Sequence, residues 1–149
     1  MTTAQTGRTF HLDADTHGAL IEHAHSDFPY EVCGLLAGVD GRLTRHYRIP
    51  NAARSMTFYN MEPRALLAAM NDIDDNGWDL VGIYHSHTHT EAYPSATDVE
   101  LAFYADAVYL IVSLQDRGRP MVRAFDIVEG EVTERTLVVG EEDSAPTER

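Results

Sequence analysis

The sequence predicts an α/β protein in which a mixed β-sheet is flanked by helices. Short apolar segments typical of strands alternate along the chain with segments of helical spacing. Two of the strand segments are joined at Asp40-Gly41, a strong hairpin signal. Interleaved helices and strands with an antiparallel hairpin indicate a mixed sheet covered by helices and disfavour an all-β barrel.

The first part of the chain begins with a short strand followed by a helix. Asp13 or Asp15 can cap this helix, because a short acidic side chain accepts hydrogen bonds from free N–H groups. Pro63 lies in the first turn of a second helix, where a missing N–H costs little. The expected elements are a strand at 9–12, a helix to about His25, two strands around Asp40-Gly41, a helix at 61–73 and a strand at 78–87.

The remaining segments predict a helix that opens near Ser95 and runs through SATDVELAFYADA, and then three strands. The strands are AVYLIVSL, MVRAFDIV and EVTERTLVV, separated by turns at 116–118 and at Glu129-Gly130. A chain of 149 residues is most simply one domain, which we place at 1–139. Residues 140–149 are polar and acidic and contain a proline, so we expect a mobile tail there.

Charge and composition exclude several classes of partner. Eleven Lys plus Arg against 24 Asp plus Glu give a net charge of −13, which disfavours nucleic acid and anionic membranes. No apolar run approaches the ~20 residues of a membrane span. The single cysteine, Cys33, excludes an intramolecular disulfide framework, and the N-terminus lacks the layout of a signal peptide. We therefore expect a cytoplasmic protein.

The stretch HSHTHTEAYPSATD at 85–98 is the strongest candidate for a functional site. On a strand, residues i and i+2 face the same way about 7 Å apart, so His85 and His87 can reach one metal ion. His89 would extend an unbent strand to about 13 Å, too far for bonds of ~2.1 Å. Unless the chain turns sharply at Thr88, a third ligand has to come from elsewhere.

Ser95 and Asp98 have two interpretations. They can cap the start of a helix, or Asp98 can be the third ligand. The combined pattern of H-x-H, seven residues and S-x-x-D would arise by chance in roughly one such sequence per thousand. Two histidines and one aspartate would leave a fourth zinc position open, as in catalytic zinc sites.

A hydrolytic zinc site also needs a carboxylate that moves protons without binding the metal. Glu31 opens the apolar segment EVCGLLAG, and Glu91 lies in the histidine loop itself. Glu31 taken alone fits a solvated strand end better than an inward-facing acid.

These residues resemble the JAMM (MPN+) metalloprotease family. The resemblance rests on EVCGLLAG at 31–38, LVGIYHSH at 80–87, Ser95 and Asp98, and it extends from about residue 8 to 137. It implies a cytidine-deaminase-like fold and one Zn²⁺ held by His85, His87 and Asp98. It further implies that Glu31 is the general base and acid, and that Ser95 donates a hydrogen bond to the oxyanion.

The resemblance also implies a substrate. Family members hydrolyse amide bonds next to the C-terminal glycine of ubiquitin-like proteins. Thr88 stands where many members have proline, and 149 residues leave little room for the insertions of eukaryotic deubiquitinases. The form of 85–102 is similar to that of compact bacterial members that release cysteine from a small sulfur carrier. We therefore expect a ubiquitin-like sulfur-carrier partner ending in Gly-Gly, and the sequence leaves a homodimer open.

Three alternatives are weighed against this prediction. A non-catalytic MPN-type scaffold would typically lack part of the ligand set, and a cupin-like iron oxygenase would need an all-β barrel. A cysteine nucleophile at Cys33 is disfavoured, because a lone cysteine in an apolar strand is usually core. The other histidines lack ligand spacing and are expected at the surface, with His89 in a solvated loop: His11, His17, His23, His25 and His46.

Overall fold

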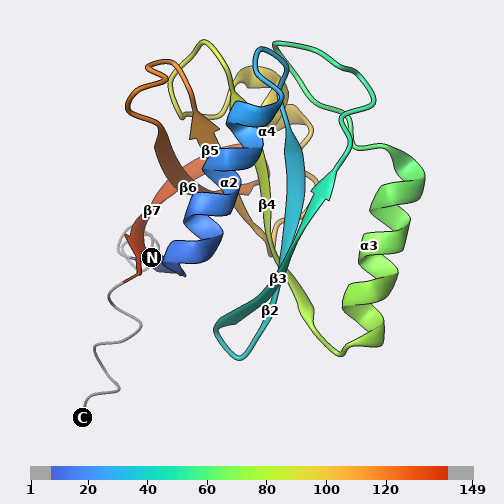
Figure 1. The fold of residues 1–149 in the computed structure, drawn as a ribbon. Helices are drawn as coiled ribbons and strands as arrows, with labels where there is room; N and C mark the ends of the chain where they lie inside the picture. Colours follow the sequence, from blue (N-terminus) through green and yellow to red (C-terminus); the bar gives the residue numbers. More distant parts are fainter. Residues whose placement is uncertain (1–7, 141–149) are drawn as a thin grey trace.

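The computed structural model describes residues 8–140, which form a seven-stranded mixed sheet with helices on both faces (Figure 1). The strand order is β1-β7-β6-β5-β4-β2-β3; the pairs β1–β7 and β4–β5 are parallel and the others antiparallel. The elements are β1 (Thr9–Leu12), α2 (Ala14–Ser26), β2 (Cys33–Val39), β3 (Arg42–Ile49), α3 (Pro63–Asp75), β4 (Asp79–His87), α4 (Ala96–Glu100), β5 (Val108–Ser113), β6 (Met121–Val128) and β7 (Glu131–Val139). The predicted fold class is confirmed.

The local signals in the sequence account for most of these boundaries. Asp13 caps α2 by accepting a hydrogen bond from the Thr16 N–H at 3.0 Å. Asp40 and Gly41 have φ of 51° and 81°, as a two-residue turn between twisted antiparallel strands requires. Pro63 is the first residue of α3, with Glu62 as its cap.

The sheet separates two apolar layers. Strands β4 and β5 are buried on both faces, because α2 covers one face while α3 and the segment after β4 cover the other. Along β4, Tyr84 packs in the layer under α2, whereas Ile83 packs in the layer under α3. Side chains alternate along a strand, so His85 and His87 share the α3 face with Ile83.

Two expectations need correction or fall outside the structure. The helix expected to open near Ser95 does so, but it ends at Glu100, because Leu101, Phe103 and Tyr104 leave the helix and line an apolar pocket. Of the predicted tail at 140–149, all but Gly140 lies outside the described residues, so the tail and the domain boundary stay predictions. Within residues 8–140, no helix is both long and apolar enough to span a membrane.

His23 is buried, so its expected place at the surface was wrong. Its Nδ1 lies 2.8 Å from the hydroxyl of Tyr84, a residue of the central strand β4. The ring of Tyr84 occupies the space in which a Cβ at Gly34 would lie, so glycine at this position of β2 allows the contact. Burial, together with the charge of Arg48, lowers the pKa of His23 to about 4.

We predict that His23 makes folding stability depend on pH. Its ordinary pKa is 6.5, so between pH 6.5 and about 4 the unfolded chain binds a proton that the folded chain does not. Stability is therefore lost as pH falls through this window, by about 2–3 kcal/mol at about 1.4 kcal/mol per pKa unit. Urea unfolding at pH 7 and pH 4 should show a smaller loss in His23→Asn than in wild type. His25→Asn, on the exposed side of the same helix, is the control; equal losses in all three proteins would contradict the assignment.

Candidate metal centre

The two histidines of the motif lie near the end of the central strand β4. His85 is paired with Cys33 of β2 and with Ile111 of β5, and it is 1% exposed. His87 follows on the same face and is 5% exposed. Pairing with both neighbours fixes the backbone of β4 at His85, and pairing with Ser113 of β5 fixes it at His87.

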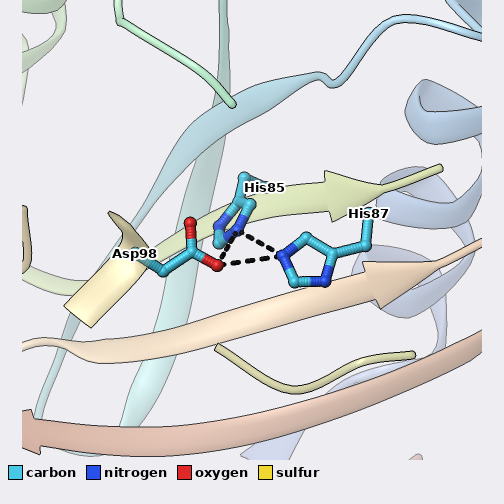
Figure 2. A group of neighbouring side chains, drawn as sticks. All are labelled: His85, His87 and Asp98. Carbon is cyan, nitrogen blue, oxygen red and sulfur yellow. Dashed lines mark hydrogen bonds and ion pairs between the residues drawn. The ribbon is translucent and has the colours of Figure 1, made fainter. Parts of the chain in front are cut away.

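Asp98 comes from the first turn of α4 and joins the two histidines (Figure 2). Its Oδ2 lies 3.1 Å from His85 Nε2 and 2.9 Å from His87 Nε2. The same oxygen accepts the Ser95 N–H at 2.9 Å, while Ser95 Oγ accepts the Asp98 N–H at 3.0 Å. The capping box and the ligand-like position therefore coexist, and the cap aims the carboxylate at the histidines.

The three facing atoms have the spacing of ligands around one small cation. His85 Nε2 and His87 Nε2 are 3.3 Å apart, and the Asp98 oxygen completes a triangle with them. Neighbouring ligands of a tetrahedral zinc ion with bonds of ~2.1 Å are about 3.4 Å apart. The residues therefore fit a zinc ion bound by three protein ligands.

The hydrogen bonds around His87 point to the same conclusion. Its Nδ1 donates to the Glu91 carbonyl at 2.8 Å, so in the neutral ring the lone pair is on Nε2. This lone pair faces the Asp98 carboxylate, and two acceptors at 2.9 Å repel each other unless a cation or a proton lies between them. Burial alone raises the pKa of Asp98, but where protons take this place, hydrogen bonds from His85 and His87 outweigh the effect of burial and hold that pKa well below its ordinary value. The three groups are thus arranged as a site that could hold one metal ion.

Glu31 lies beside this cluster, immediately before β2. It is 3% exposed, and its Oε1 has no hydrogen-bond partner among the described residues. Burial raises the pKa of Glu31 to about 8, with the charge of His87 lowering it and that of Asp98 raising it further. The solvated strand end considered from sequence is therefore wrong: Glu31 is a buried carboxyl that can hold or release a proton near neutral pH.

The structure also places the other candidates. Ser95 is exposed, and its role as an acceptor leaves its own O–H free to donate. The Cys33 thiol is buried, and burial raises its pKa to about 12, which leaves it protonated and a poor nucleophile. His89 is exposed as expected, and its ring lies against Phe28.

Several residues that shape the centre were not found from the sequence. The ring of Tyr59 lies against that of His85, with centroids 4.6 Å apart. Asn51 donates from Nδ2 to the Glu31 carbonyl, and Ser86 Oγ accepts the Val32 N–H. Tyr59 and Asn51 lie in the connection from β3 to α3, which has no periodic pattern that could reveal them.

Comparison with known proteins identifies the family. Residues 13–128 match the prokaryotic homologs of the JAB domain. The chain therefore belongs to the prokaryotic JAB family, within the JAB/MPN group, which confirms the resemblance read from its motifs.

Three relatives show how far the similarity extends. The CysO-cysteine peptidase of Mycobacterium tuberculosis is 46% identical over 133 residues, which cover 88% of this chain and 91% of that protein. A desampylase of Haloferax volcanii is 39% identical over 113 residues, 71% of this chain and 81% of that protein. A probable TtuB-protein conjugate cleaving protease of Thermus thermophilus is 36% identical over 118 residues, 78% and 74% of the two chains. The names of these relatives support a hydrolase.

Solved structures agree on the fold. A Desulfitobacterium hafniense protein determined in solution has a TM-score of 0.78 and 36% identity, covering 88% of this chain and 92% of that chain. A JAB1/MPN domain protein of Archaeoglobus fulgidus has a TM-score of 0.57 and 20% identity, covering 88% and 98%. The second similarity concerns the fold alone.

We predict that Asp98→Ala lowers zinc affinity by more than about 100-fold, because a charged ligand is lost from a three-ligand site. Competition with a chromogenic chelator measures the change. Ser95→Ala removes one capping bond and keeps all three ligand atoms, so it should bind zinc within a few-fold of wild type. Undiminished zinc binding by Asp98→Ala would show that its carboxylate is not a ligand.

Proposed function

We propose that this protein is a zinc-dependent hydrolase that cleaves the amide bond after the C-terminal Gly-Gly of a small ubiquitin-like sulfur carrier and releases a single amino acid, cysteine. The observation that carries the proposal is the buried Glu31 carboxyl, whose Oε1 has no hydrogen-bond partner among the described residues, beside three converging candidate ligand atoms. A buried acid without a partner costs stability, and catalysis supplies a reason to keep it.

The relatives support the substrate class. Two of their names specify a conjugate, CysO-cysteine and TtuB-protein, and the enzymes so named cleave it. The family resemblance connects such enzymes with carriers that end in Gly-Gly. Identity is higher to the enzyme named for cysteine release, 46% against 36%, which favours cysteine over a conjugated protein as the leaving group.

The reaction needs a polarised carbonyl and controlled proton transfer. A zinc ion held by His85, His87 and Asp98 would supply Lewis acidity, which polarises the scissile carbonyl and makes water more acidic. Glu31 takes the proton of the attacking water and delivers it to the leaving amine. The raised pKa suits both steps, because a carboxyl near neutral pKa accepts and releases a proton at similar cost.

Ser95 and His87 have supporting roles in this proposal. The free O–H of Ser95 donates a hydrogen bond to the oxyanion as the carbonyl carbon becomes tetrahedral. The bond from His87 Nδ1 to the Glu91 carbonyl fixes the ring orientation and leaves Nε2 free for the metal.

An apolar pocket of about 270 Å³ lies next to the centre and is suited to the carrier tail. Tyr59 belongs to both, because its ring contacts His85 and also lines the pocket. Ile83 lines it as well, and it precedes His85 by two residues, or about 7 Å. Two extended glycines span the same ~7 Å, so the first side chain upstream of Gly-Gly would reach the pocket.

We predict that Glu31→Gln lowers kcat by about 10²–10⁴-fold and leaves zinc bound, because glutamine keeps the shape but cannot accept a proton. Mass spectrometry of a carrier ending in Gly-Gly-Cys measures turnover as the loss of one cysteine. Glu91→Gln is the matched control and should retain activity, since its carboxylate lies on the exposed loop. Near-normal turnover by Glu31→Gln would exclude Glu31 as the base. No cleavage by zinc-loaded wild type would favour the scaffold function.

We also predict that Phe103→Ser raises KM for the carrier about tenfold with little change in kcat. Phe103 lines the pocket yet is 74% exposed, so its ring is available to an apolar side chain of the tail. Leu67→Ser is the control, because Leu67 is 62% exposed on α3 but does not line the pocket. Equal KM values for Phe103→Ser and wild type would place the tail elsewhere.

A further inference from the structure

The connection from β3 to α3 lies against the backbone of the buried acid, Glu31. The Glu31 N–H donates to the Ser55 carbonyl at 2.8 Å, and Asn51 Nδ2 donates to the Glu31 carbonyl at 3.0 Å. Asn51 Oδ1 in turn accepts the N–H groups of Ala53 and Asn60, which holds the connection in a fixed loop. The residue before Ser55 is therefore held near the segment that carries Glu31.

That residue is Arg54, whose cation has no acidic partner between residues 8 and 140. The guanidinium carbon lies 4.5 Å from the ring centroid of Tyr30, the residue before Glu31. Arg54 is exposed and makes no ion pair with any residue in the part of the chain that the structure describes. In a chain with a net charge of −13, an arginine that has no acidic partner among residues 8–140 and stacks on the residue before Glu31 is a distinct local feature.

The backbone of Arg54 is also unusual. Its φ is 45°, in the left-handed region that is strained for a residue with a side chain and unstrained for glycine. Glycine would fit this turn without that strain, so the backbone conformation gives no reason for an arginine at this position.

The proposed reaction places the leaving group on the side of the metal centre where Glu31 lies. Glu31 must reach the leaving amine to protonate it, so that amine lies on the Glu31 side of the scissile bond. In a released amino acid the carboxyl carbon is only about 2.5 Å from the amine nitrogen, given N–Cα and Cα–C bonds of about 1.5 Å. A free α-carboxylate released beside Glu31 therefore comes close to the segment of Tyr30, on whose ring Arg54 is stacked.

We propose that Arg54 binds the free α-carboxylate of the residue that is released, and so selects substrates in which a single C-terminal amino acid follows Gly-Gly. The planar guanidinium can donate two parallel hydrogen bonds to a carboxylate, and stacking on Tyr30 restricts its orientation beforehand. Arg54 takes no part in bond making or breaking. The inference rests on the proposed function and adds the feature by which the site distinguishes a free amino acid from a conjugated protein.

The test compares two carriers that differ only at the end of the chain: one with a Gly-Gly-Cys carboxylate and one with a Gly-Gly-Cys carboxamide. Wild type should cleave the carboxylate with a kcat/KM about 10–100-fold above that for the carboxamide. Arg54→Gln should cleave the carboxylate carrier more slowly and the carboxamide carrier at an unchanged rate, so that the preference is lost. The unchanged rate with the carboxamide carrier would also show that the variant is folded. Arg54→Lys should restore part of the preference.

Arg117→Gln is the matched control. Its guanidinium carbon lies 4.4 Å from the Phe28 ring in the same kind of stack, but Arg117 belongs to the β5–β6 turn. The preference should survive this substitution. An unchanged preference in Arg54→Gln, or equal cleavage of both carriers by wild type, would overturn the inference while leaving the proposed function intact. No cleavage of either carrier by wild type would overturn the proposed function itself.

Discussion

Oδ2 of Asp98 accepts the Ser95 N–H and lies 3.1 and 2.9 Å from the Nε2 atoms of His85 and His87. When its ring is neutral, His87 Nε2 is an acceptor, so it and the Asp98 oxygen repel each other unless a cation or a proton lies between them. The fold tolerates this repulsion because the pairing of β4 holds the two histidines near each other and the capping box holds the carboxylate. The same oxygen thus joins a helix start to the candidate metal site.

The acid that completes the site is held by the same strand. Ser86, between the two histidines, accepts the Val32 N–H through its Oγ, and Thr88 donates from Oγ1 to the Met56 carbonyl. These bonds connect the end of β4 to the segment of Glu31 and to the loop before α3; the three segments meet at one end of the sheet, at the top of Figure 1. The position of Glu31, the proposed proton-transferring group, is therefore coupled to the position of the candidate ligands, although they lie more than fifty residues apart in sequence.

Sequence patterns over a few residues predict most of the secondary structure and the grouping of three side chains of the site. The period of two along a strand brings His85 and His87 to one face, and the S-x-x-D spacing places Asp98 at the start of a helix. The burial of Glu31 and His23 depends on which elements cover them, and a chain read residue by residue contains no such information. Tyr59 contacts His85 from an irregular loop, and the helix after Ser95 stops early because its apolar residues turn towards a pocket formed with α3.

The most direct test of this account is a crystal structure of the zinc-loaded protein with anomalous data at the zinc absorption edge. We expect one anomalous peak within about 2.0–2.2 Å of His85 Nε2, His87 Nε2 and an Asp98 oxygen, with the Glu31 carboxyl outside bonding distance. A peak coordinated by Glu31, or a peak away from the three ligand atoms, would contradict the division between metal ligands and proton-transferring acid on which the proposed reaction depends.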